Sequence, residues 1–262
     1  MSEVIQRCHV CGKACPLSFE HIPPKSLGND HVVRLYKAVD IIRKANAFDA
    51  SRTHEVRYSK MRRGSGVTAL CAKCNSYFGA NYVREYTGCI RELGALLLHQ
   101  HPKNGSKGIH LEGVHVNTLA FFKHVISNFC ATTPFGTMLD CKEFLLDKES
   151  NDFPSKYQLF MFAVPNAQSI MVSTGWITAF TEHGVCTLAH VASFPVGFTM
   201  LNTEISSYSP VGLGCDITSM ALLRWGECPE FSLDLPFMNL DKIIPVAATE
   251  GNSNSLNNER ER

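Results

Sequence analysis

Two Cys-x-x-Cys pairs constrain the fold of this chain more than any other feature of its sequence. The first pair is Cys8 and Cys11, the second is Cys71 and Cys74, and 59 residues (12–70) lie between them. Each pair presents two sulfurs on one side of a tight turn, and two such turns complete a tetrahedral zinc site. We therefore expect one shared structural zinc site with a sizeable folded segment between the turns. Free or redox-active thiols are the alternative interpretation.

The cysteine usage and the start of the chain favour a reducing compartment. The chain has 11 cysteines, and its first residues show neither an apolar signal-peptide core nor a small-residue cleavage site. The longest apolar runs, such as 159–165, are far shorter than the roughly 20 residues that a membrane-spanning helix needs. We therefore expect metal binding in place of disulfides, a cytoplasmic location and no membrane partner.

The charges divide the chain into a basic part and an acidic part. Residues 1–110 carry 17 Lys and Arg against 8 Asp and Glu, whereas the remainder carries 8 against 16. A polar break, HPKNGSKG, lies close to this change. We expect a domain over 1–108, a second domain over 109–248 and a disordered tail over 249–262. The basic first domain is suited to a polyanionic partner.

Hydrophobic periodicity predicts an α+β fold class. Apolar residues at spacings of three to four predict helices over 31–47, 75–101 and 117–131. Runs rich in β-branched and aromatic residues predict an antiparallel meander, with strands near 157–165, 169–180, 184–193 and 195–202. A helix over 216–225 and a strand over 230–235 complete a second α+β domain with a mainly antiparallel sheet.

A second motif adjoins the cysteine pairs. Residues 17–28 read LSFEHIPPKSLG and follow the first pair, and Asn75 directly follows the second pair. The combination resembles the zinc-knuckle branch of the HNH endonuclease superfamily, over residues 7–85 or about a third of the chain. This resemblance implies a ββα-metal fold, in which a short hairpin and a helix surround a catalytic centre.

The resemblance also implies roles for three residues. His21 matches the general base, and Glu20 and Asn75 match the two protein ligands of a catalytic Mg²⁺ or Mn²⁺ that is distinct from the zinc. The residue types suit this chemistry, because His can deprotonate water near neutral pH and Mg²⁺ prefers oxygen ligands. Considered one at a time, the three residues have ordinary structural interpretations: His21 as a hydrogen-bonded loop residue, Glu20 as a solvated carboxylate and Asn75 as a helix cap.

The sequence departs from the family pattern before the second cysteine pair. The middle Asn of that pattern, which helps to fix the base, has no match in residues 60–70. Asn29 and Asn46 lie far upstream, and the insertion between His21 and Cys71 is longer than is usual in the family. The orientation of His21 is therefore left open, and an inactive, degenerate domain is the alternative.

The leading hypothesis is an endonuclease that hydrolyses phosphodiester bonds of DNA, with RNA as the other substrate class. Lys25, Arg62 and Arg63 are predicted phosphate contacts, and a solvated basic face is the alternative. A single-metal centre cuts one strand, so double-strand cleavage needs a homodimer or two events. A non-catalytic module that binds nucleic acid or protein is the second hypothesis. The acidic domain could also sense an activating ligand or protein, and a host-defence setting is an analogy with similar fusions.

Overall fold

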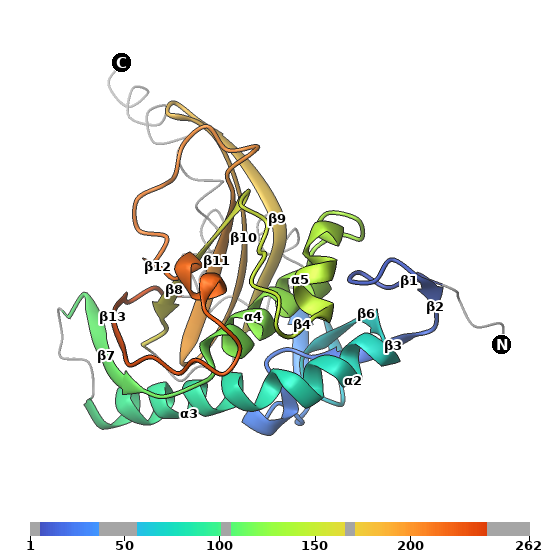
Figure 1. Cartoon of the computed structure of the whole chain (residues 1–262), viewed down its shortest axis with the longest axis horizontal. Coiled ribbons are helices and arrows are strands. Elements are labelled where there is room, and N and C mark those ends of the chain that lie inside the picture. The colour runs from blue at the N-terminus through green and yellow to red at the C-terminus, as the bar shows by residue number, and fades with distance from the viewer. Residues whose placement is uncertain (1–5, 37–56, 101–105, 166–170, 240–262) are drawn as a thin grey trace, which may run out of the picture.

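The computed structural model describes residues 6–36, 57–100, 106–165 and 171–239. These residues form a mixed fold of helices and mostly antiparallel sheets, which confirms the predicted α+β class (Figure 1). The predicted tail over 249–262 lies outside the described residues. Within the described residues, no helix is long and apolar enough to cross a membrane.

The amino-terminal part is built from three two-stranded antiparallel sheets, β1–β2, β3–β6 and β4–β5, and a helix. Strands β1 (Gln6–Arg7) and β2 (Ala14–Cys15) pair around the first cysteine turn. Strand β3 (Leu17–His21) pairs antiparallel with β6 (Gly66–Cys71), and α2 (Ala72–Asn81) follows β6 without a loop. A 3-10 turn, η1 (Lys25–Leu27), lies in the connection after β3. A strand, a returning strand and a helix therefore follow one another, with the second cysteine pair at the strand–helix junction.

The helix predicted over 31–47 is wrong in its first part. Residues 33–36 form β4 (Val33–Tyr36), which pairs antiparallel with β5 (Tyr58–Met61). The apolar residues here alternate with polar ones at the period of two that a strand requires, whereas the helical interpretation relied on a looser apolar spacing. The rest of the predicted helix lies outside the described residues.

The helices predicted over 75–101 and 117–131 are confirmed, with one break. The first is divided at Tyr82 into α2 and α3 (Val83–Gln100). The second is α4 (Thr118–Thr132), whose first turn is capped by the Asn117 side chain through a 3.1 Å bond from the Ala120 amide. Residues 118–131 of α4 are all buried. Helix α4 is therefore the centre of the fold and packs against α3 and the large sheet.

The large sheet differs from a simple meander in one connection. Its strands are β8 (Tyr157–Ala163), β9 (Met171–Thr181), β10 (Gly184–Ser193), β11 (Val196–Asn202) and β12 (Cys215–Asp216). The spatial order is β12-β8-β11-β10-β9, so β9, β10 and β11 form the predicted meander, but β8 pairs with β11. Strand β11 is buried at every residue, which requires a partner on each edge.

The remaining elements close the fold beside α3 and α4. Strand β13 (Phe231–Pro236) confirms the predicted strand and pairs with β7 (Gly108–Val114), which was not predicted. The helix predicted over 216–225 is only a 3-10 turn, η4 (Thr218–Leu222). The turn η3 (Leu139–Cys141) and the short helix α5 (Lys142–Leu146) follow α4.

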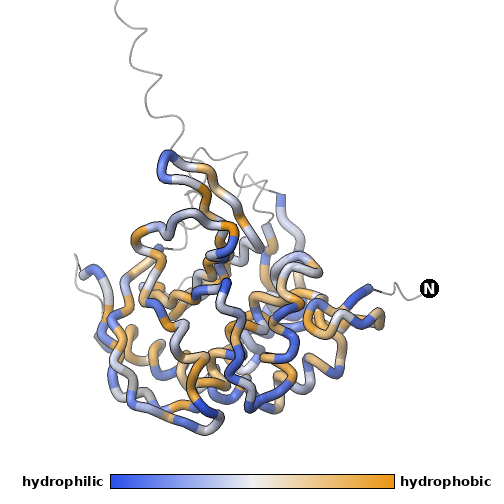
Figure 2. Tube along the Cα trace, turned by 45° about the horizontal axis from the view of Figure 1, so that its top comes forward, coloured by the Kyte–Doolittle hydropathy of each residue, from blue (hydrophilic) through white to orange (hydrophobic). Residues whose placement is uncertain are grey.

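One continuous hydrophobic core joins the two predicted domains. It contains Val10 and Leu70 from the amino-terminal part as well as Leu159 and Phe198 from the large sheet. Figure 2 shows hydrophobic segments in the interior and hydrophilic residues at many of the outer turns. The boundary near residue 108 stays a prediction, and the parts on either side of it share packing.

Candidate metal centre and catalytic site

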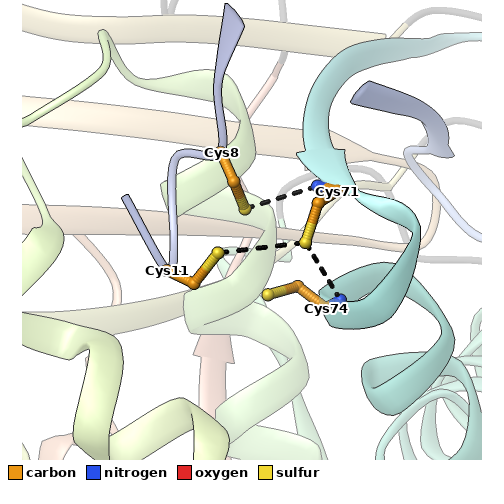
Figure 3. A group of neighbouring side chains, drawn as sticks. All are labelled: Cys8, Cys11, Cys71 and Cys74. Atoms are coloured by element: carbon orange, nitrogen blue, oxygen red, sulfur yellow. Dashed lines mark hydrogen bonds between the residues drawn. The ribbon is translucent and has the colours of Figure 1, made fainter. Parts of the chain in front are cut away.

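The two cysteine pairs converge on one point. The sulfur atoms of Cys8, Cys11, Cys71 and Cys74 all lie within 4.8 Å of one another, and they point toward a common centre in Figure 3. A tetrahedron with Zn–S bonds of about 2.3 Å has S–S edges of about 3.8 Å. The Cys11 and Cys71 sulfurs are 3.9 Å apart, and none of the four is in a disulfide. The predicted four-cysteine cluster therefore forms, and its geometry can hold a zinc ion.

Backbone geometry presents these sulfurs to the centre. Gly12, at φ 72°, turns the first loop so that its amide donates to the Cys8 carbonyl over 2.9 Å. Cys71 is the N-cap of α2, and its sulfur accepts from the Cys74 amide over 3.4 Å. The Cys71 amide in turn donates to the Cys8 sulfur over 3.3 Å. Amide donors of this kind stabilise negative charge on metal-binding thiolates.

The thiols of the cluster lie close enough to shift one another's pKa. A hydrogen bond with Cys74 lowers the pKa of Cys8 to about 4, and the same pairing raises the pKa of Cys74. Burial raises the pKa of Cys11. Thiolates bind metals and thiols do not, so occupancy by a cation would release protons from this cluster.

Glu20 is the one buried residue of β3. Glu20 is 9% exposed, and burial raises the pKa of its carboxyl group to about 7. Within the described residues, its carboxylate has no hydrogen bond and no ion pair. Burial removes part of the water around the anion, which disfavours the charged form unless a cation is present. Such a group is well suited to a cation.

His21 is oriented by the backbone of the loop that precedes β6. Its Nε2 lies 2.9 Å from the Arg63 carbonyl oxygen, and its ring meets the Phe19 ring edge-on at 4.9 Å. A carbonyl oxygen only accepts hydrogen bonds, so in the neutral imidazole the proton is on Nε2. Nδ1 then carries the lone pair that a general base needs.

Asn75 lies in the first turn of α2 and contacts β3. Its Nδ2 donates to the Ser18 hydroxyl and to the Phe19 carbonyl, each over 3.1 Å. The carbonyl contact fixes which end of the amide is nitrogen, so Oδ1 is the atom left to act as an acceptor or ligand. Asn75 is not the helix cap, because Cys71 has that position.

The predicted catalytic residues share one hairpin–helix unit without touching one another. Asn75 reaches the backbone of Phe19, which directly precedes Glu20. Phe19 and His21 share one face of β3 and contact each other, and Glu20, between them, points to the opposite face. Within the described residues, no hydrogen bond joins Glu20, His21 and Asn75.

The three predicted phosphate contacts have different surroundings. Lys25 is exposed in η1, and Arg62 is exposed after β5. The guanidinium carbon of Arg63 lies 4.0 Å from the centre of the Phe19 ring, and the Arg63 carbonyl binds His21. Arg63 is thus the predicted contact nearest to the candidate base.

Asn29 lies at the candidate site, and its contacts there could not be predicted from the sequence. It is 5% exposed, and its Nδ2 donates to the carbonyls of Pro23 and Ser65 over 2.6 and 2.7 Å. Its Oδ1 accepts from the Ser65 amide over 2.7 Å. These bonds join the loop after His21 to the loop before β6, across 36 residues of sequence. No local spacing signals such a contact.

None of the protein-family models, curated proteins or solved structures compared with the chain matches it. The resemblance to HNH endonucleases therefore rests on the sequence motif. The four-cysteine cluster is the part of that motif for which the fold provides a binding geometry.

Proposed function

We propose that the protein is a metal-dependent endonuclease of the HNH type that hydrolyses phosphodiester bonds of DNA. One observation carries the proposal. His21 ends β3 with Nε2 held by the Arg63 carbonyl, inside a hairpin–helix unit whose strand–helix junction belongs to the four-cysteine cluster. A ring fixed in this way offers Nδ1 to a water molecule.

The proposed reaction needs only one proton acceptor from the chain. His21 Nδ1 takes a proton from water, the water oxygen forms a bond to phosphorus, and the bond from phosphorus to the leaving oxygen breaks. The leaving oxygen gains a proton from solvent, so the products are a phosphomonoester and a hydroxyl. Zinc in the cysteine cluster has a structural role in this scheme.

Glu20 and Asn75 would hold the catalytic Mg²⁺ or Mn²⁺. Glu20 is 9% exposed, and within the described residues its carboxylate has no hydrogen bond or ion pair. The Asn75 amide nitrogen is bound to β3, which leaves its oxygen for a ligand. Carboxylate and amide oxygens suit a hard divalent cation. When bound, such a cation neutralises charge on the phosphate and the leaving oxygen.

We assign Asn29 to the middle position of the HNH pattern. Its three hydrogen bonds hold the loop that follows His21 against the loop that supplies the Arg63 carbonyl. Asn29 is thus a positioning residue, because it acts on His21 through the backbone. Gly64 belongs to the same contact, since a Cβ there would lie 2.2 Å from the Asn29 carbonyl oxygen.

A binding module without catalysis is the second candidate. The observation in its favour is that, among the described residues, no hydrogen bond joins the side chains of Glu20, His21 and Asn75. The carboxy-terminal part could influence either function, because it contacts His9 of the first cysteine turn. The Nδ1 atom of His9 lies 3.2 Å from the Cys130 carbonyl oxygen, and the ring centroids of His9 and Phe135 are 5.9 Å apart. A ligand or protein that moves the end of α4 would act on the cysteine cluster through this contact.

A plasmid assay separates the two candidates. Zinc-loaded protein is incubated with supercoiled DNA and Mg²⁺ or Mn²⁺, beside His21→Ala and a reaction without added divalent cation. His31→Ala is the matched control, because His31 is exposed in the same connection and its side chain, within the described residues, bonds the Gly28 carbonyl alone. We expect metal-dependent nicking by wild type and His31→Ala, and none by His21→Ala. Equal inertness of folded, zinc-loaded wild type and His21→Ala contradicts the nuclease.

A further inference from the structure

Strands β4 and β5 form a two-stranded hairpin with one basic and aromatic face. Its register pairs Arg34 with Lys60 and Tyr36 with Tyr58. Alternation along a strand places these four side chains on the same face, and Val33, Leu35 and Met61 on the other. Arg34 and Lys60 are exposed, and Tyr58 is 42% exposed.

The side chains of this face are arranged as a continuous surface. The Arg34 guanidinium carbon lies 4.8 Å from the centre of the Tyr58 ring. The Tyr36 and Tyr58 rings are 5.8 Å apart between centroids. The face thus presents two cations beside two phenol rings, a combination that contacts phosphates through charge and hydroxyl groups.

The charges of the hairpin are unbalanced. Residues 31–36 and 57–63 contain five Lys and Arg and no Asp or Glu. Among the described residues, neither Arg34 nor Lys60 has an acidic partner. Like charges placed directly opposite each other destabilise an antiparallel pair, so this pairing lowers the stability of the free hairpin. A polyanion against the face would remove that repulsion.

The base of the hairpin is also the support of the candidate catalytic residue. The Gly64 amide donates to the His31 carbonyl over 2.9 Å and closes the hairpin below its first pair. Arg63, which precedes Gly64, binds His21. Lys60 lies three residues before Arg63, so the backbone that carries the face continues directly into the backbone that binds His21.

We infer that the Arg34–Tyr36–Tyr58–Lys60 face of this hairpin binds the backbone of duplex DNA at the major groove and aligns one strand with His21. The inference rests on the proposed function. A B-form major groove admits a two-stranded β-ribbon, whereas the major groove of duplex RNA is deep and narrow. The geometry of a ribbon therefore favours duplex DNA over duplex RNA.

Binding is measured by fluorescence anisotropy with a labelled 30-base-pair DNA duplex, without added Mg²⁺ or Mn²⁺, over a series of salt concentrations. The test variant is Arg34→Gln with Lys60→Gln, and the charge-preserving variant is Arg34→Lys with Lys60→Arg. The matched control is Lys107→Gln with Lys142→Gln, two lysines outside the hairpin, of which Lys107 is exposed and the Lys142 side chain is 43% exposed and paired with Glu143. Zinc content and melting temperature are recorded for each protein, and Lys60→Gln alone serves if the double variant does not fold.

We expect the Gln variant to bind about tenfold more weakly or worse near 0.1 M salt, with a salt slope reduced by about 1.8, or 0.9 for each lost phosphate contact. Its melting temperature should be unchanged or higher, because the repulsion is gone. The charge-preserving and control variants should bind like wild type.

Other outcomes overturn the inference in distinguishable ways. Wild-type affinity and slope in the Gln variant, together with metal-dependent plasmid nicking, refute the hairpin surface and leave the nuclease intact. Equal or tighter binding to duplex or single-stranded RNA refutes the choice of duplex DNA. An inability of wild type to bind or nick any nucleic acid refutes both the inference and the proposed function.

Discussion

Replacement of Asn29 by Ala is expected to destabilise the protein by about 3 kcal/mol. The substitution removes three hydrogen bonds of 2.6–2.7 Å from a side chain that is 5% exposed. Each bond contributes about 1 kcal/mol net, and a buried group that loses its partner costs about 1–3 kcal/mol. Three bonds at about 1 kcal/mol each give a total of about 3 kcal/mol, which leaves a typical domain folded.

Urea denaturation of the zinc-loaded protein measures this loss of unfolding free energy, from the midpoint of the transition and the dependence of the free energy on urea concentration. The matched control is Asn151→Ala, which removes a single exposed bond of 3.3 Å; we expect it to cost under about 0.5 kcal/mol. Asn29→Asp keeps an acceptor for the Ser65 amide but places its second carboxylate oxygen against the Pro23 and Ser65 carbonyls, so it should destabilise the protein at least as much as Asn29→Ala. An Asn29→Ala protein within about 1 kcal/mol of the Asn151→Ala control would refute the assigned role of the contact.

Three further perturbations have defined outcomes. Cys74→Ser, or removal of zinc by a chelator, should abolish stoichiometric zinc binding and lower the melting temperature by several degrees, as read by metal analysis and calorimetry. Gly64→Ala should destabilise at least as much as Asn29→Ala in urea, because a Cβ would meet the Asn29 carbonyl oxygen at 2.2 Å and φ is 87°. Burial lowers the pKa of Lys123 from 10.5 to about 8, so between these values the unfolded chain holds a proton that the folded chain lacks. The free energy of unfolding of wild type should therefore rise by up to about 3 kcal/mol relative to that of Lys123→Met as the pH rises through this interval. Parallel urea titrations of both proteins at pH 8 and pH 10 measure this difference, and an equal change in both proteins would contradict the prediction.

The elements with strong local signals could be predicted from the sequence. The Cys-x-x-Cys spacing identified the cluster, since each pair fixes its own turn geometry. Helix α4 was found within one residue because Asn117 caps it and its apolar residues recur at helical spacing. Strands β9, β10 and β11 were found because short turns separate them.

The features that depend on distant contacts could not be predicted. The partner of β8 is β11, from a later part of the chain, and strand composition does not encode that choice. The pairing of β7 with β13 joins residues that are more than 110 positions apart in sequence, and Val114 and Phe231 are the pair with the smallest separation. The role of Asn29 has the same origin, because its partner Ser65 is brought close only when β3 and β6 pair.

The error over residues 33–36 has a local cause. Val33, Leu35 and Tyr36 fit both a loose helical spacing and a short alternating strand, and a segment of four residues is too short to separate the two. Pairing with β5 decides the outcome. The resulting strand carries the basic and aromatic face, so the misread segment is also the basis of the DNA-binding inference.

The measurement that tests the central claim most directly is binding of Mn²⁺ to the zinc-loaded protein, followed by electron paramagnetic resonance. The claim is that the chain holds a catalytic cation at Glu20 and Asn75 in addition to zinc. It predicts one bound Mn²⁺ per chain in wild type, in His21→Ala and in the control Asp30→Asn, an exposed acid of the same connection. It predicts no bound Mn²⁺ in Glu20→Gln. Wild-type protein that binds no Mn²⁺, or Glu20→Gln that binds it as wild type does, would contradict the account.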